Sequence, residues 1–256
     1  MKDKPALLKL ASVSKAFGGV QALDDISFEF DAGLIMGLIG PNGAGKTTLF
    51  NVITGAYVPD SGAVSLDGIP IQGRRIQDIV HLGISRTFQN VELFESMSVI
   101  ENIMVGRHVR TRSGFWSAIT RVPAIRREEK ALRERAQELL DFVGLADQAD
   151  RRSGDLPFGW QRLLEIARAL ASDPKLLLLD EPAAGLNAVE TGRLGELIGN
   201  IRDLGVTVML VEHDMALTMS VCDQIIVLDQ GCMLAEGLPR EIQSNAAVMA
   251  AYLGNG

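Results

Sequence analysis

The first part of the chain alternates apolar and polar residues in a way that predicts an N-terminal antiparallel sheet. Residues 7–30 alternate in short runs, and residues 26–30 have the period-two pattern of a half-buried strand. Residues 33–39 form a continuous apolar run that leads into Gly40, and residues 47–53 have the pattern of a helix. We therefore predict a sheet, then a buried strand, a glycine-rich loop and a helix.

Helical periodicity dominates the middle of the chain. Ser98-Val99-Ile100-Glu101 has the spacing of a capping box, which predicts a helix start just after Met97. Apolar residues recur at helical spacing over residues 124–143, and Gly144 ends that run. The middle section is therefore expected to be a helical insertion at roughly residues 91–160.

Strands and helices alternate again after Asp173-Pro174. Strand-like runs at residues 176–179 and 206–211 flank a helix, and residues 225–228 and 232–235 are predicted to close a hairpin. The expected layout is one α/β domain that the helical insertion interrupts.

Composition restricts the classes of protein to which this chain can belong. Among its 256 residues 47% are hydrophobic and 22% charged, which is typical of a globular protein. A net charge of −7 argues against nucleic acid as a partner. No run approaches the roughly 18 apolar residues of a spanning helix, and the opening Met1-Lys2-Asp3-Lys4-Pro5 lacks a signal peptide's apolar segment. We expect a cytoplasmic chain that reaches the membrane only through a partner.

The two cysteines, Cys222 and Cys232, do not form a CxxC pair. This usage suits a reducing compartment and neither a zinc site nor a disulfide scaffold. Both are expected to be buried structural thiols.

A phosphate-binding loop follows the first buried strand. Gly40-Pro41-Asn42-Gly43-Ala44-Gly45-Lys46-Thr47 matches G-x-x-x-x-G-K-[ST] in full, between a predicted strand and helix. Its glycines let backbone N–H groups wrap the triphosphate of ATP, Lys46 supplies charge to the β- and γ-phosphates, and Thr47 offers a hydroxyl to Mg²⁺. Thr48 can reach the α-phosphate. The eight-position match disfavours the alternative, an ordinary glycine-rich turn.

Two carboxylates end the apolar strand at residues 176–179. Charges are normally avoided at a buried strand end, so Asp180 and Glu181 point to chemistry. Beside a phosphate loop, Asp180 is expected to hold Mg²⁺ and Glu181 to polarise the attacking water.

Four further motifs resemble those of ABC transporter ATP-binding subunits. They are Gln89 after Arg86-Thr87-Phe88, residues 156–162 (LPFGWQR), residues 183–187 (AAGLN) and His213, in the order of a Q-loop, signature, D-loop and switch histidine. The resemblance implies a P-loop NTPase (RecA-like) core with an N-terminal antiparallel β subdomain and an inserted helical subdomain. The core would span roughly residues 1–90 and 161–235, the insertion 91–160 and a C-terminal tail 236–256.

The resemblance also assigns roles to single residues. Phe17 would stack on adenine, although a lone aromatic is about as often a core residue. His213 would contact the γ-phosphate, and Gln89 would sense Mg²⁺ and the water. Val91, Leu93, Phe94 and Met97 could receive a helix of a membrane subunit or could be the core of the insertion.

The signature departs from the usual L-S-G-G-Q form. Pro157, Phe158 and Trp160 replace serine, glycine and glutamine, whereas Gly159 keeps its N–H for the nucleotide of a partner subunit. A helix is expected from Gln161, and Asn187 stands where a D-loop aspartate is common. These changes are expected to weaken the site that this signature completes.

Several stretches look like the ATPases of branched-chain amino-acid importers, namely residues 86–91, 99–102, 183–187, 211–215 and 251–254. Similar subunits serve urea uptake and lipopolysaccharide export. The resemblance implies a second ABC ATPase subunit, identical or homologous, two membrane permease subunits and a periplasmic or extracellular binding protein, at the cytoplasmic face of the plasma membrane. A phosphate-loop kinase and a non-transport ABC ATPase are the alternatives. Gln89, the signature region and His213 argue against the kinase, and the sequence has neither the long coiled-coil insertions nor the two cassettes usual in a non-transport ABC ATPase.

Overall fold

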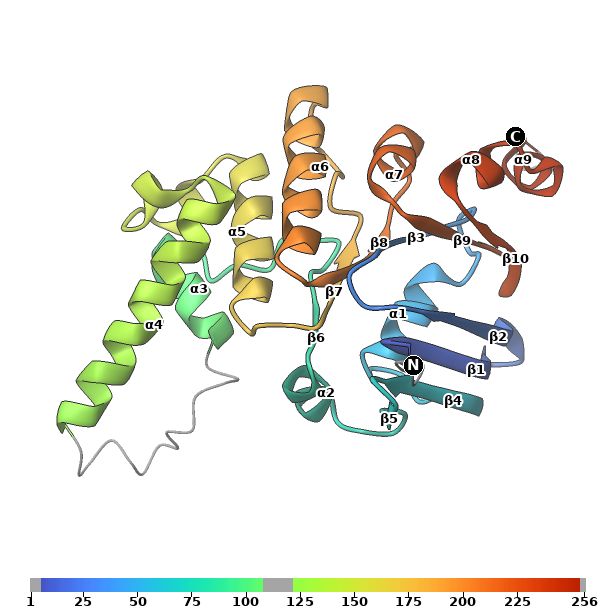
Figure 1. The fold of residues 1–256 in the computed structure, drawn as a ribbon, viewed down its shortest axis with the longest axis horizontal. Coiled ribbons are helices and arrows are strands. Elements are labelled where there is room, and N and C mark those ends of the chain that lie inside the picture. The colour runs from blue at the N-terminus through green and yellow to red at the C-terminus, as the bar shows by residue number, and fades with distance from the viewer. Residues whose placement is uncertain (1–5, 108–121, 254–256) are drawn as a thin grey trace, which may run out of the picture.

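The computed structural model describes residues 6–107 and 122–253 and contains two sheets (Figure 1). The N-terminal sheet is antiparallel, in the order β2-β1-β4-β5, which confirms the predicted β subdomain. Its strands are β1 (Leu8–Phe17), β2 (Val20–Phe30), β4 (Ser61–Leu66) and β5 (Ile69–Pro70).

The second sheet has the order β10-β9-β3-β8-β7-β6 and is parallel except for β10. Its strands are β3 (Ile35–Ile39), β6 (Ile84–Arg86), β7 (Leu176–Asp180), β8 (Thr207–Val211), β9 (Gln224–Asp229) and β10 (Cys232–Gly237). The predicted closing hairpin is therefore confirmed, with Gln230 and Gly231 at positive φ as a two-residue turn of this kind requires.

Both faces of the parallel sheet are covered. Leu177 and Leu179 of β7 pack into one hydrophobic cluster, while Leu176 and Leu178 pack into the other. Figure 1 shows α5 (Phe158–Leu170), α6 (Ala188–Asp203) and α7 (Met215–Val221) on one side, and α1 (Lys46–Ile53) with the antiparallel sheet on the other. Double-sided burial explains why β7 has no polar alternation.

The helical part lies at one end of the molecule, beyond β6, with α2 (Ile76–Leu82) beneath that strand (Figure 1). It contains α3 (Val99–Arg107), α4 (Val122–Val143) and two short turns, η3 (Ala146–Gln148) and η4 (Ser153–Asp155). The predicted capping box is present, because Ser98 N donates to Glu101 Oε2 at 2.8 Å and Glu101 N donates to Ser98 Oγ at 3.3 Å.

One helix start was predicted wrongly. Helix α5 begins at Phe158 rather than at Gln161, and Pro157 is its N-cap residue with φ of −55°. Proline suits this place because its fixed φ is compatible with a helix entry and a missing N–H costs nothing there. The apolar stripe alone did not reveal this first turn.

The chain ends in two short helices, α8 (Pro239–Gln243) and α9 (Ala246–Leu253). Within residues 6–107 and 122–253, the helices are all too short or too polar to cross a membrane.

Candidate functional site

The predicted site residues follow strands that end at one edge of the parallel sheet. Strand β3 leads into Gly40, β7 into Glu181 and β8 into Glu212, while β6 ends at Arg86. The carboxyl edge of a parallel sheet is where ligands bind in open α/β folds, because loops from several strands converge there.

Two glycines of the phosphate loop have different structural reasons. A Cβ on Gly40 would lie 2.1 Å from the Leu228 carbonyl oxygen, so only glycine allows this approach of loop and β9. Gly43 has a φ of +81° and nothing within 4 Å of a Cβ position, which leaves open space in front of the loop. A phosphate chain fits such an arrangement of turned backbone and free space.

Lys46 is buried in the loop that it follows. Its Nζ donates to the carbonyl oxygens of Gly40 at 2.7 Å and Pro41 at 3.0 Å. Burial lowers the pKa of Lys46, and the carboxylates of Glu181 and Asp180 oppose that shift. The ammonium group is thus held at the loop by neutral acceptors, which anionic phosphate oxygens would replace favourably.

The structure brings Gln89, Glu181 and His213 together. Gln89 Nε2 donates to Glu181 Oε2 at 2.9 Å, and His213 Nε2 lies 3.0 Å from Glu181 Oε1. Glu181 has a positive φ of 48°, unusual for a non-glycine residue, and its N–H donates to the Val211 carbonyl oxygen at 2.9 Å. The carboxylate therefore lies between two polar side chains that come from loops after β6 and β8.

The oxygen donors at this edge fit Mg²⁺. Thr47 is exposed and its hydroxyl bonds to none of the described residues, and Asp180 contributes a carboxylate. The described residues contain no cluster of three or more His, Cys, Asp or Glu that could hold a metal ion by themselves. Magnesium typically uses one or two carboxylates together with substrate phosphates, so this donor set suits a metal that arrives with its nucleotide.

Glu212 is a structural residue of the site that the sequence did not reveal. Its buried carboxylate accepts N–H bonds from Ala183 at 2.7 Å, His213 at 3.0 Å and Asp214 at 3.3 Å. Burial raises the pKa of Glu212, while these three N–H groups lower it. The residue joins the loops after β7 and β8 and so fixes His213 relative to Glu181. A charge at the end of an apolar strand, the signal that pointed to Asp180, is present here too.

A buried ion pair on α5 holds the segment that carries Gln89. Arg162 donates to the carbonyl oxygens of Phe88 at 2.9 Å and Gln89 at 2.8 Å, and Glu165 accepts from Phe88 N at 3.1 Å. Arg162 and Glu165 are 3.1 Å apart with side chains 1% exposed, and burial raises the pKa of Glu165. Gln89 is thereby tied to the helix that begins at Pro157. In the sequence, the two charged residues Arg162 and Glu165, three positions apart within an apolar stripe, are the signal from which this ion pair could have been predicted.

Phe17 lies at the end of β1 and is 42% exposed, so the alternative that it is a core residue is wrong. The Tyr57 ring meets it edge-on at 5.0 Å between centroids, and Lys15 Nζ lies 5.3 Å from the ring centre. Asp60 secures this corner by pairing with Lys15 at 2.8 Å and accepting from Ala16 N at 2.7 Å. An exposed, supported aromatic ring is suited to stacking on a planar base.

Gly159 lies in the first turn of α5. The side chains that would meet a Cβ on Gly159 are those of Glu190 and Leu186, at the beginning of α6. Asn187 caps α6, since its Oδ1 accepts from Val189 N and Glu190 N. The structure thus explains Asn187 as a helix cap and brings the signature to the D-loop rather than to the phosphate loop.

The expectation that both cysteines are buried is wrong for one of them. Cys222 is buried and Cys232 is exposed. Cys232 begins β10, the edge strand of its sheet, where one flank has no neighbouring strand to cover it. Burial raises the pKa of Cys222 to about 12, with a smaller contribution from Asp223.

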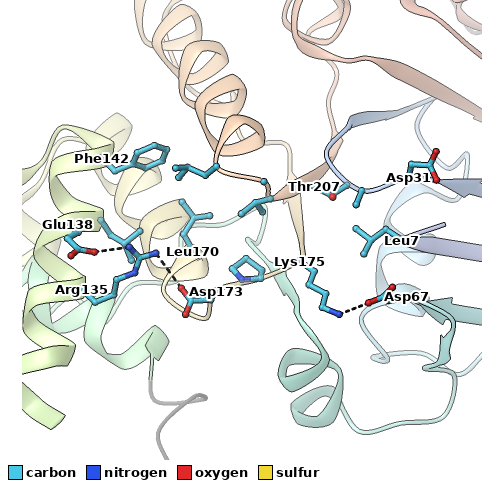
Figure 2. A pocket seen from close by; sticks show the side chains of 16 residues that line it. Leu7, Asp31, Asp67, Arg135, Glu138, Phe142, Leu170, Asp173, Lys175 and Thr207 are labelled. Atoms are coloured by element: carbon cyan, nitrogen blue, oxygen red, sulfur yellow. Dashed lines mark hydrogen bonds and ion pairs between the residues drawn. The ribbon is translucent and has the colours of Figure 1, made fainter. Parts of the chain in front are cut away.

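A cavity of about 940 Å³ lies at the other edge of the parallel sheet. It is lined by Lys175, just before β7, and Thr207, at the start of β8 (Figure 2). Figure 2 shows its cations paired: Arg135 with Glu138 at 2.8 Å and Asp173 at 3.4 Å, and Lys175 with Asp67 at 2.7 Å. The nucleotide motifs contribute nothing to this cavity.

Comparison with known proteins finds matches over most of the chain. Residues 23–184 match the family model described as ABC transporter, and residues 232–256 match branched-chain amino acid ATP-binding cassette transporter. The high-affinity branched-chain amino acid transport ATP-binding protein LivG of Salmonella typhimurium is 45% identical over 249 residues, covering 97% of this chain and 98% of the relative.

Solved structures agree with the fold. An ATP-binding cassette of an ABC transporter in its ADP conformation has a TM-score of 0.86 at 30% identity, covering 98% of this chain and 99% of that one. A dimeric ATP-binding cassette in a post-hydrolysis state with ADP and Pi has a TM-score of 0.76 at 26% identity, covering 91% and 99%.

Proposed function

This chain belongs to the ABC transporter family, and we propose that Lys46, Asp180 and Glu181, with Gln89 and His213, form its ATP-hydrolysing site. The chain is an ATP-binding subunit whose ATPase activity is coupled to transport. The observation that carries the assignment of the site is the Glu181 carboxylate, which Gln89 and His213 contact from two sides at 2.9 and 3.0 Å. Membership of this family excludes the alternative that the chain is a phosphate-loop kinase.

In the proposed site each residue acts on one part of the nucleotide. The backbone N–H groups of residues 40–48 and the Lys46 ammonium bind the phosphates, and Phe17 stacks on the base. Thr47, Asp180 and Gln89 would hold Mg²⁺, and the metal would supply positive charge to the phosphates of the nucleotide. Glu181 orients the attacking water and accepts its proton, while His213 fixes the carboxylate and faces the γ-phosphate.

We propose branched-chain amino acids as the transported substrate. The support is the 45% identity to LivG across 97% of the chain, together with the matching model for residues 232–256. Uptake of labelled leucine, valine and urea in cells that carry the full transporter, with wild-type or Glu181→Gln chain, tests this. If the Glu181→Gln cells lose uptake of leucine and valine but not of urea, the proposal is supported. If they lose uptake of urea but not of the amino acids, the proposal is contradicted.

The atoms nearest to a Cβ at Gly159 belong to Glu190 and Leu186 rather than to the phosphate loop, which supports a site shared between two subunits. In the proposed head-to-tail dimer, the signature of each chain faces the nucleotide of the other. This agrees with a dimeric structural relative. The helix at Pro157 leaves the Gly159 N–H, a first-turn donor, without a bond inside the described chain, as a phosphate ligand requires.

The proposed contact with a membrane subunit lies beside Phe94. A cavity of about 600 Å³ here is lined by Leu93, Phe94, Glu165 and Arg168, among others. Glu165 also accepts a hydrogen bond from the Phe88 N–H at 3.1 Å. A helix bound in this cavity would therefore be connected to Gln89 through Glu165 and Phe88. We place the chain at the cytoplasmic face of the membrane, with two permease subunits and a substrate-binding protein in the full system.

Nucleotide titration tests the proposed site directly. Lys46→Ala removes the only loop side chain that can neutralise the β- and γ-phosphates, so binding of a fluorescent ATP analogue and hydrolysis should both collapse. Lys9→Ala is the matched control, because Lys9 is an exposed lysine of β1 paired with Glu29 at 2.6 Å. Equal binding by wild type and Lys46→Ala would remove the loop from the proposal.

A further inference from the structure

Arg86 joins three functional parts of the site through one guanidinium group. Its Nη2 donates to Asp180 Oδ2 at 2.6 Å, and its Nη1 donates to Asn51 Oδ1 at 2.6 Å. Asn51 belongs to α1, the helix that begins with Lys46 and Thr47. Arg86 itself ends β6, three residues before Gln89. The phosphate-loop helix, the strand-end carboxylate and the Gln89 segment therefore meet at this side chain.

The guanidinium is held rigidly and away from water. The side chains of Arg86 and Asp180 are 9% and 7% exposed. The Arg86 guanidinium carbon lies 5.5 Å from the centre of the Phe50 ring and 5.3 Å from that of Phe88. Its Nε is buried without a hydrogen-bond partner among the described residues. A buried ion pair with an unsatisfied donor contributes little to the stability of the fold, because the cost of desolvation offsets the attraction between the charges. A contribution to stability therefore does not by itself explain why Arg86 and Asp180 are paired here.

The two oxygens of Asp180 are not equivalent. Arg86 occupies Oδ2, whereas Oδ1 accepts no hydrogen bond from any described residue. A carboxylate fixed through one oxygen cannot rotate freely, so the other oxygen is held in one direction. Ligands of metals are commonly oriented in this way by groups behind them, and loss of such a group typically weakens metal binding.

We propose that Arg86 is a positioning residue for the metal site, which holds Asp180 through Oδ2 so that Oδ1 is directed to Mg²⁺ and ties this ligand to the helix that carries Thr47. This inference rests on the proposed function, since it takes Asp180 as a ligand of the metal. The guanidinium does not touch the nucleotide; it acts through Asp180 and Asn51.

The test measures how much Mg²⁺ strengthens nucleotide binding, not how fast ATP is hydrolysed. A fluorescent ADP analogue is titrated into the full chain with Mg²⁺ and with excess chelator, and the ratio of the two affinities is the readout. For Arg86→Gln the ratio should fall about tenfold or more, as for other groups behind a metal ligand, while the Mg²⁺-free affinity stays near the wild-type value. A purely structural role would lower both affinities together, which would overturn the proposal, as would a raised ratio.

Further variants keep the test decisive where Arg86→Gln fails to fold. Arg86→Lys keeps the charge but cannot bind Asp180 and Asn51 at the same time as the guanidinium does. Asn51→Ala removes only the hydrogen bond between Arg86 and α1. Both variants should therefore lower the ratio by a smaller factor than Arg86→Gln. Arg75→Gln is the matched control, because Arg75 pairs with Asp78 at 2.9 Å on the surface, and its ratio should not change. Wild-type ratios in both Arg86→Lys and Asn51→Ala would overturn the proposal.

Asp180→Asn separates this inference from the function on which it rests. If Asp180→Asn abolishes the effect of Mg²⁺ while the Arg86 variants keep it, only the positioning role of Arg86 fails. If Asp180→Asn itself keeps the full effect of Mg²⁺, the proposed metal site fails and the role of Arg86 fails with it.

Discussion

His213 Nε2 lies 3.0 Å from Glu181 Oε1, across the gap between the loops that follow β8 and β7. Glu212, the neighbour of His213, accepts the Ala183 N–H at 2.7 Å and so locks these two loops together. The histidine and the carboxylate are therefore held in register by a second, buried carboxylate.

Replacing Glu181 by glutamine should separate binding from chemistry. The amide keeps the size of the side chain but cannot accept a proton, so turnover should fall by about 10² or more while ATP binding is preserved. ATPase assays and fluorescent-nucleotide titration of the same preparation provide the two measurements. Near-normal turnover would remove Glu181 from the catalytic role.

Phe17→Ala should weaken nucleotide binding without abolishing it. Loss of base stacking typically costs about 1 to 3 kcal/mol, far less than loss of the phosphate contacts. Tyr57→Phe serves as the control because it keeps the ring that meets Phe17 edge-on at 5.0 Å. Unchanged affinity in Phe17→Ala would show that the base is bound elsewhere.

Phe94→Asp should prevent assembly with the membrane subunits and leave the chain folded. Phe94 is 47% exposed, so a charge there adds no buried carboxylate, although it loses the contact with Arg168 at 5.8 Å. Leu93→Asp is the contrasting variant, since Leu93 packs against the main hydrophobic cluster and its replacement should unfold the chain. Co-purification and thermal melting distinguish the two, and normal assembly of Phe94→Asp would argue against the contact.

Restoring the signature with Pro157→Ser and Phe158→Gly should accelerate hydrolysis at the site built on the partner's phosphate loop. One hydroxyl bond to a charged phosphate is worth about 1.5 to 3 kcal/mol, enough to make two sites unequal. The Phe158 ring now approaches the position of a Gly185 Cβ to 2.9 Å, so its removal also frees the D-loop. In the assembled transporter, equal losses from mutating the catalytic glutamate of either subunit would contradict this asymmetry.

The two thiols should react at different rates. Cys232 is exposed, whereas Cys222 is buried with its pKa raised to about 12, so almost no thiolate forms at neutral pH. A thiol reagent should therefore modify one equivalent in the native chain and two after denaturation. Two equivalents reacting at the same rate in the native chain would show that Cys222 is accessible. Cys232→Ser is the control that removes the fast reaction.

The sequence alone determined the parts of this protein that depend on neighbouring residues. The strand, glycine-rich loop and helix around residues 40–47, the capping box at Ser98 and the apolar strand before Asp180 were all predicted correctly, because glycine spacing, cap chemistry and double-sided burial act over a few positions. The family resemblance assigned Gln89 and His213 to the surroundings of the γ-phosphate and the attacking water, whereas their contacts with Glu181, at 2.9 and 3.0 Å, became visible only in the structure.

Tertiary structure alone decided which distant residues meet. Arg86 and Asp180 are 94 positions apart and pair because β6 and β7 are adjacent in the sheet and end at the same edge. Glu212 reaches Ala183 for the same reason, through the adjacency of β7 and β8. The exposure of Phe17 and of Cys232 also depends on position at a sheet's end or edge, which no local pattern encodes. Strand order is set by the packing of the whole core, so contacts between loops at strand ends become visible only once that order is known.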